Sequence, residues 1–229
     1  NDPSEGIATM PLFADAAFER DALDFFPTPI ADTLEDAAAE LSARAQRDKV
    51  VETSRVAVRL IALLALAAAP GTPGAGGQLA ELRRKLLRQG LTDGEWVGLA
   101  RETLRPFAGD PEHFAIPALV TAFFTRDGKL RGPFDQQGAC EKLLAMRKAE
   151  TVAHGVTGTE EHAVEVLAAR LPDLEVFLKA LAWLWNVTLV VPTARHGRPD
   201  GRVEHVVLRL VGVTPRRGFR PQALALPGE

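Results

Sequence analysis

Cysteine is almost absent from this chain of 229 residues, and tyrosine is absent altogether. The single cysteine, Cys140, excludes a disulfide framework within the chain and a zinc site built from several cysteines, and it fits a reducing cytoplasm best. A lone cysteine among leucine and alanine is usually a small buried residue. We therefore expect a cytoplasmic protein that is held together by an apolar core, with Cys140 inside that core.

An excess of positive charge and a long apolar run are missing too. The formal net charge is −3, so the chain as a whole does not attract nucleic acid, and contact with RNA needs a local basic patch. The most apolar segment, Leu60 to Ala69, is too short to span a membrane, so no membrane contact is expected. The composition that remains, 46% hydrophobic and 25% charged residues, is typical of a globular protein with a sizeable core.

Helical periodicity prevails over most of the chain, which predicts a mainly α fold, a helical bundle. The longest helical pattern starts at Asp32, which caps it together with Glu35, and it continues to Ala69 with one break at residues 46–49. Pro172 predicts a kink or a break in the last long helix. Further helices are expected at 15–26, at 78–89, after the cap signal at 91–94, at 114–124 and in the run that ends at Gly155.

The C-terminal part of the chain changes from helical to strand periodicity. Val187–Pro192 and Val203–Val211 are rich in β-formers and flank the turn-forming residues 195–202, which predicts a C-terminal β-hairpin. An isolated hairpin is marginal in water, so this one is expected to pack on the helices or to join another sheet.

The chain thus divides into three expected segments: an N-terminal extension (1–26), a helical domain (27–186), and a β-hairpin appendage or the start of a following domain (187–229). It begins without methionine and stops soon after the predicted strands. We therefore expect it to be part of a longer protein.

One helical run carries an arginine and a histidine seven positions apart, Arg147 and His154, and ends at Gly155. At about 100° per residue, seven positions bring two side chains within about 20° of each other. A guanidinium holds a phosphate in fixed geometry, and an imidazole titrates near neutral pH and can act as general acid or base. These are the functions that metal-independent cleavage of RNA needs. The other interpretation is structural, with His154 at the helix end bonding the last carbonyls.

Arg147, the six residues that follow it and His154 resemble the Arg-x(4–6)-His motif of HEPN domains. The apolar helix before the motif, the acidic start of the helix after it and the long N-terminal helix with Glu52 are also similar to HEPN-like modules, and the resemblance covers Phe26 to Trp185. It implies an all-helical bundle, usually dimeric, of a kind that often serves bacterial defence and toxin systems. It also implies an RNase active site that is composed across a dimer from Arg147 and His154.

The residue after the arginine departs from the family pattern. HEPN ribonucleases commonly have a polar residue such as Asn, Asp or His there, whereas this chain has Lys148, which favours the non-catalytic members that bind ligands or partners. We therefore favour a sensing or interaction module of a larger bacterial conflict or signalling protein. The alternatives are a metal-independent endoribonuclease toxin or effector and a structural scaffold domain. No cofactor is expected, and the expected partners are a second copy, RNA, and other proteins or further domains of a longer chain.

Other polar residues supply further candidates for a site. Glu52 is expected to orient Arg147 from the neighbouring helix, and Arg55 and Arg59 lie near enough to Glu52 to pair with it. The histidines show no spacing typical of metal ligands, so no metal site is expected. Contacts with nucleic-acid phosphates are expected from three basic residues: Lys148, Arg83 and Arg84.

Overall fold

The computed structural model describes residues 12–69, 77–152, 159–197, 203–213 and 222–224, and side chains in α7 are described up to Met146. The fold is mainly α, which confirms that prediction. The helices are α1 (Ala16–Phe25), α2 (Thr28–Ala39), α3 (Ala43–Ala68), α4 (Gly77–Arg88), α5 (Asp93–Leu104), α6 (Pro117–Phe123), α7 (Ala139–Val152) and α8 (Glu160–Ala180). Short 3-10 turns are η1 (Arg105–Phe107), η2 (Pro111–His113), η3 (Gly132–Phe134) and η4 (Ala182–Asn186).

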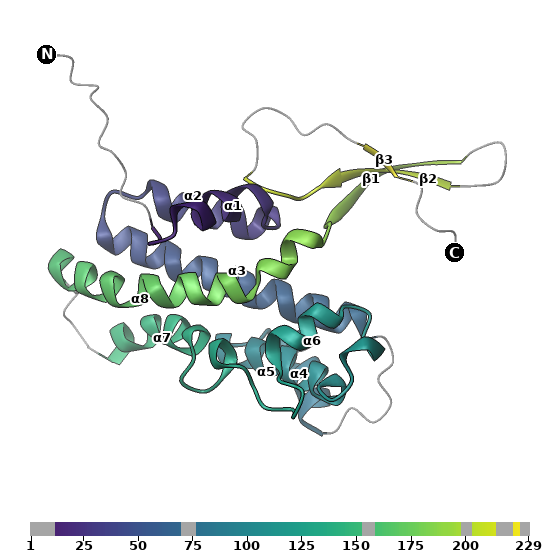
Figure 1. Cartoon of the computed structure of the whole chain (residues 1–229), viewed down its shortest axis with the longest axis horizontal. Coiled ribbons are helices and arrows are strands. Elements are labelled where there is room, and N and C mark those ends of the chain that lie inside the picture. Colours follow the sequence, from purple (N-terminus) through teal and green to yellow (C-terminus); the bar gives the residue numbers. More distant parts are fainter. Residues whose placement is uncertain (1–11, 70–76, 153–158, 198–202, 214–221, 225–229) are drawn as a thin grey trace, which may run out of the picture.

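Figure 1 shows α8 lying across the bundle, between α1 and α2 on one side and α7 on the other, and the strands extending away from the helices. The long helix α3 contacts α2, α5, α7 and α8, and so forms the centre of the bundle. Within the described residues, no helix combines the length and the hydrophobicity that a membrane crossing requires.

Local capping signals set the start of the first two helices. α1 begins after Asp15, whose side chain accepts a hydrogen bond from the N–H of Phe18 at 3.0 Å. α2 begins at Thr28, with Pro29 in its first turn, where the missing N–H of proline costs nothing. Asp32 therefore lies inside α2, and the predicted helix start at Asp32 was wrong.

The break between α2 and α3 lies at residues 40–42, so the predicted break at 46–49 was wrong. Ser42 caps α3, because its side chain accepts a hydrogen bond from the N–H of Ala45. The hydroxyl of Ser42 also donates to Glu160 at the start of α8, at 3.3 Å. A carboxylate from another helix thus reinforces this N-terminus, and such a long-range contact cannot be seen in a local pattern.

α8 continues through Pro172 without a break. Thr159 caps its start, and Pro172 removes only the helical hydrogen bond to the carbonyl of Ala168, which belongs to an exposed residue. The buried residues Leu167 and Leu174 hold the helix in place on both sides of the proline. Side-chain packing therefore keeps the helix whole where local propensity would allow it to break.

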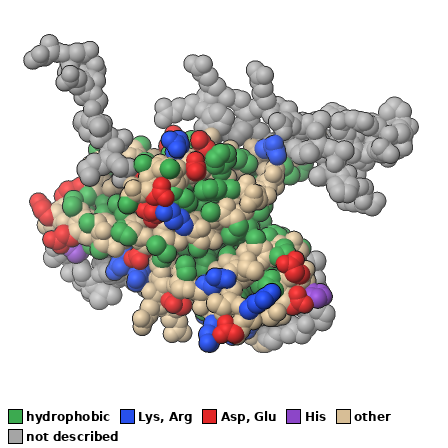
Figure 2. All heavy atoms as spheres, viewed as in Figure 1, with side chains coloured by type: hydrophobic (Ala, Val, Ile, Leu, Met, Phe, Trp, Pro, Cys, Tyr) green, Lys and Arg blue, Asp and Glu red, His purple; other side chains and the backbone are tan. Residues whose placement is uncertain are grey.

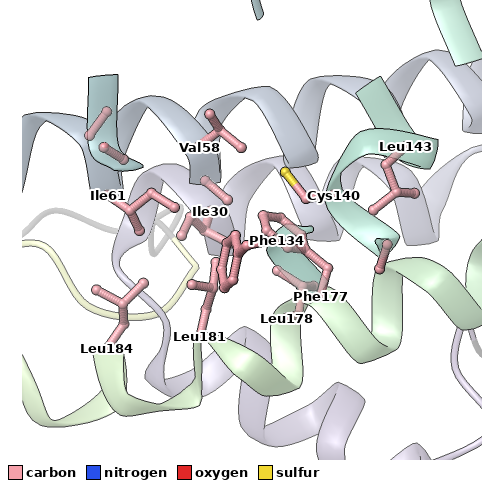
Figure 3. Close-up of a cluster of buried hydrophobic side chains, with 14 of the residues drawn as sticks. Ile30, Val58, Ile61, Phe134, Cys140, Leu143, Phe177, Leu178, Leu181 and Leu184 are labelled. Carbon is pink, nitrogen blue, oxygen red and sulfur yellow. The ribbon is translucent and has the colours of Figure 1, made fainter. Parts of the chain in front are cut away.

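The core joins α3, α7, α8 and η3 through large side chains that point toward one another (Figure 3). The ring of Phe134 stacks on Phe123 with centroids 4.0 Å apart and meets Phe177 edge-on at 5.8 Å. Cys140 is 1% exposed within this cluster, as predicted, and burial raises the pKa of its thiol to about 12. Gly138, just before α7, has no room for a side chain, because a Cβ there would collide with the carbonyl oxygen of Gly132.

α1 shares this core, so the packing continues across the boundary expected at residue 26. Phe18 of α1 stacks on Trp185 at 5.8 Å, and Phe26 meets the same indole edge-on at 5.8 Å. Trp185 and Trp183 are half-buried against the core, and Trp96 is buried in it. All three tryptophans therefore pack against the core.

Within the described residues, the strands form one sheet in the order β1 (Val190–Gly197), β2 (Val203–Arg209), β3 (Gln222–Leu224). β1 and β2 pair antiparallel, with an irregularity between Pro192 and Ala194, and β3 adds antiparallel to β2. β1 starts three residues later than predicted and continues into the predicted turn, and β3 was not predicted.

The segment after β2 is tied to the helices by backbone hydrogen bonds. The N–H of Thr28 donates to the carbonyl of Leu210 at 3.2 Å, and the N–H of Gly212 donates to the carbonyl of Phe26 at 2.8 Å. Gly212 has a φ of +70°, and a Cβ there would meet the carbonyl oxygen of Asp24 at 2.9 Å. This attachment gives the strands the helical support that an isolated pair would lack.

Candidate functional site

The end of α7 holds the arginine of the predicted motif. Arg147 lies in α7, one turn after the buried residues Leu143 and Leu144, which pack this helix against α3 and α8. The side chain of Arg147, and the whole of His154, lie outside the described residues. Their expected alignment therefore stays a prediction.

Glu52 lies on α3, with its described partner on the same helix. Its carboxylate is 3.4 Å from the ammonium of Lys49, which also reaches Asp36 of α2 at 2.9 Å. The hydrogen bond to Asp36 and then the one to Glu52 raise the pKa of Lys49. This cluster joins α2 to α3, and the expected contact of Glu52 with Arg147 stays a prediction.

Arg55 and Arg59 turn to α5 and share one carboxylate there. The Nε atom of Arg55 donates to both carboxylate oxygens of Asp93 at 2.9 Å, and a terminal nitrogen of Arg59 lies 3.9 Å from the same carboxylate. Asp93 is the first residue of α5, where the helix dipole also favours a negative charge. Instead of the pairing with Glu52 that the sequence suggested, Arg55 contacts a residue of another helix 38 positions away in the chain.

Two of the four basic residues of α4 pair with carboxylates. Arg84 forms an ion pair with Glu81 of the same helix, and Lys85 reaches Glu95 of α5 at 2.7 Å. Glu95 also completes the predicted cap of α5 by accepting from the N–H of Thr92 at 2.9 Å. The hydrogen bond from Lys85, followed by those from Thr92, lowers the pKa of Glu95 to about 2.

Of the three residues predicted to contact nucleic acid, two are on α4 and one is on α7. Arg84 has a carboxylate partner, Arg83 is half-buried, and the side chain of Lys148 lies outside the described residues. α4, which carries Arg83 and Arg84, packs on α5. A nucleic-acid surface from all three residues stays a prediction. Among the described residues, no three His, Cys, Asp or Glu side chains are grouped so that they could hold a metal ion.

α8 carries an apolar surface that the sequence analysis did not single out. We call it the outer face of α8, and its residues are Val164, Ala168, Pro172 and Val176. All four side chains are exposed, and Val164 and Val176 are 54% and 51% exposed. Figure 2 shows hydrophobic side chains on the surface along α8 and acidic ones near its start.

The sequence contains a pattern for this face, because its four residues recur at every fourth position and so lie along one side of a helix. The same helix also has buried apolar residues at Leu167, Leu174 and Leu178, however, so apolar residues surround most of its circumference. A helix with apolar residues on several sides does not show which side faces the core. The packing on α3 and α7 resolves this, because it covers one side of α8 and leaves the other open.

Comparison of the chain with models of protein families, with curated proteins and with solved structures gave no match.

Proposed function

We propose that this chain is a HEPN-like interaction module that forms a homodimer through the outer face of α8 and serves a bacterial conflict or signalling system. The motif Arg147-x6-His154 and its helical surroundings support the family assignment, and HEPN-like modules are usually dimeric. The exposed outer face of α8 is the observation that carries the proposal. A row of apolar residues along a 21-residue helix, uncovered within the described part of the chain, is a surface typical of a protein interface.

The outer face is self-complementary about residue 170. When two copies of α8 pack antiparallel across a two-fold axis at this residue, Val164 of one copy lies opposite Val176 of the partner subunit. Ala168 then lies opposite Pro172 of the partner subunit. A surface that matches itself in this way is what a two-fold dimer requires.

The small residues at the centre allow the two helices to approach closely. Ala168 and Pro172 lie nearest the two-fold axis and carry no bulky side chain. Residues four positions apart form a ridge along a helix. Such ridges on two helices interlock when the helices cross at an angle of about −50°. The carbonyl of Ala168 lacks a helical donor because Pro172 has no N–H, so it is also free to accept a hydrogen bond at the contact.

The oligomeric state of the chain in solution tests this proposal. Sedimentation velocity at micromolar concentrations is expected to give twice the monomer mass of 24.7 kDa. Ala168→Glu places two carboxylates of like charge close to the two-fold axis and is expected to give monomers. Circular dichroism should show an unchanged helix content, because Ala168 is exposed.

Leu87→Glu is the matched control, because Leu87 is an 87% exposed apolar residue on α4, away from α8. This variant is expected to stay dimeric. A wild-type chain that remains monomeric throughout the concentration range would contradict the proposal. So would a dimer that survives Ala168→Glu.

The endoribonuclease alternative rests on the pairing of Arg147 with His154 in the sequence. A nuclease of this kind is expected to cleave RNA in the presence of a chelator and to lose this activity in His154→Ala. His162→Ala is the control, because His162 is a solvent-exposed histidine at the start of α8. If the site is composed across the dimer, Ala168→Glu also lowers cleavage. An intact dimer that cleaves none of a broad panel of RNAs would remove the alternative and leave the interaction module.

A further inference from the structure

A pocket of about 680 Å³ lies between α6, the turn that follows it and the C-terminal end of α8. Its volume falls in the range of about 300 to 1,000 Å³ that is usual for small-molecule sites. Its apolar wall is formed by six residues: Ala118, Ala122, Leu130, Pro133, Ala180 and Trp183. The indole of Trp183 gives this wall a flat aromatic surface. In Figure 2 the surface is hollowed between α6 and the end of α8, with hydrophobic side chains in the hollow.

Arg131 is the polar residue of this pocket whose side chain can still donate hydrogen bonds to a ligand. Its backbone N–H donates to the carbonyl of Phe123 at 2.8 Å, and its Nε donates to the carbonyl of Phe124 at 3.2 Å. Both bonds hold the arginine in the turn after α6, where Phe124 also bridges to Leu130. Among the described residues no carboxylate forms an ion pair with Arg131. Its terminal N–H groups are therefore available to bind an anion.

The second cation of the pocket is already neutralised. Lys179 lies 2.7 Å from Glu175 and 3.0 Å from Asp15, and both contacts raise the pKa of its ammonium. The lining threonines are engaged as well, since Thr121 donates to the carbonyl of Ala118 at 3.1 Å and Thr125 donates to the carbonyl of Lys129 at 3.1 Å. The pocket thus offers one guanidinium, a mostly apolar wall and no lining carboxylate.

We propose that this pocket binds a small carboxylate with a flat apolar body, whose carboxylate pairs with Arg131 and whose body lies against Trp183. A guanidinium matches a carboxylate with two parallel hydrogen bonds. A single available cation matches a monoanion, whereas a phosphate dianion would keep an uncompensated charge close to the carboxylates that hold Lys179. The proposal does not depend on the dimer, because the outer face of α8 contributes no residue to the pocket.

Naphthalene-2-carboxylate is a suitable probe, and naphthalene-2-methanol is its uncharged counterpart. We expect saturable binding of the carboxylate by calorimetry. In a ¹H–¹⁵N spectrum, the indole signal of Trp183, assigned through Trp183→Phe, is expected to shift. The indole N–H of Trp183 is buried without an acceptor among the described residues, so its signal reports any rearrangement of this wall. The uncharged compound is expected to bind about tenfold more weakly, because it cannot form the charge-assisted hydrogen bonds.

Two variants and one control complete the test. Arg131→Gln is expected to weaken binding of the carboxylate about tenfold, to the level of the uncharged compound. Ala122→Phe places a ring in the pocket from α6, and it is expected to abolish binding of both compounds. Arg126→Gln, which changes an exposed arginine of the same turn outside the pocket, is expected to leave both affinities unchanged. The proposal is overturned if the carboxylate does not bind saturably, or if neither Arg131→Gln nor Ala122→Phe weakens its binding.

Discussion

The two faces of α8 differ in their surroundings although both are apolar. On the inner face, Leu174, Phe177 and Leu178 have no exposed surface, and they contact side chains from α3, α7 and η3. On the outer face, Val164 and Val176 keep about half of their surface exposed. The inner face therefore stabilises the fold, while the outer face keeps apolar surface exposed to solvent. Hydrophobicity alone does not separate these two uses, whereas burial in the fold does.

The largest expected effect comes from a cavity on the inner face. Phe177→Ala removes a fully buried ring that meets Phe134 edge-on, and it is expected to lower the free energy of unfolding by about 3 to 5 kcal/mol. Urea unfolding followed by circular dichroism measures this change. Val176→Ala is the neighbouring control and is expected to change the stability of the monomer by less than about 0.5 kcal/mol. Similar losses in both variants would show that the two faces do not differ as described.

A smaller effect is expected where the inner face meets solvent. Asp173 pairs with Arg170 of its own helix at 3.0 Å and with Lys142 of α7 at 3.5 Å. Asp173→Asn is expected to lower the free energy of unfolding by about 0.5 to 1 kcal/mol, and less at high salt, because such pairs are partly screened. Glu165→Gln is the control, since Glu165 is 81% exposed and lies 3.9 Å from its partner His162. An equal effect of both variants would contradict a specific role of Asp173.

Low pH weakens the ionic contacts of the bundle but not the apolar contacts of α8, because apolar side chains do not titrate. The pKa of Glu95 is lowered from 4.5 to about 2 in the folded chain. The contribution of the Glu95 carboxylate to stability is therefore present above pH 4.5 and is lost as the pH falls from 4.5 to about 2. Wild type is expected to exceed Glu95→Gln in the free energy of unfolding at pH 6, and the difference should vanish near pH 2. A difference that does not depend on pH would refute the ionic origin.

The smallest effect on monomer stability is expected on the outer face, where the effect on association should be the larger one. Val164→Ser is expected to change the free energy of unfolding of the monomer by less than about 0.5 kcal/mol, because the side chain is half exposed already. The same variant is expected to weaken self-association, which sedimentation equilibrium measures. A loss of monomer stability without any change in association would assign Val164 to the fold and not to an interface.

Local signals predicted the elements well where a cap and a periodicity coincide. The cap signal at 91–94 and the buried Cys140 were both visible in the sequence. The break between α2 and α3 was misplaced, because Glu160 of a distant helix supports the N-terminus at Ser42. For the predicted site, the sequence placed Arg147 in a helix correctly, whereas its relation to His154 lies outside the described residues.

The sequence by itself determined the mainly α class, the position of most helix ends and the presence of apolar residues around α8. Helix propensity, capping and periodicity depend on residues within a few positions, so they can be read from the chain. Only the tertiary structure decided which face of α8 is buried, and only it brought Arg131 and Trp183, which are far apart in the sequence, into one pocket. Both depend on how α8 packs against α3, α7 and the turn η3, and such packing joins residues whose separation in the chain no local pattern records.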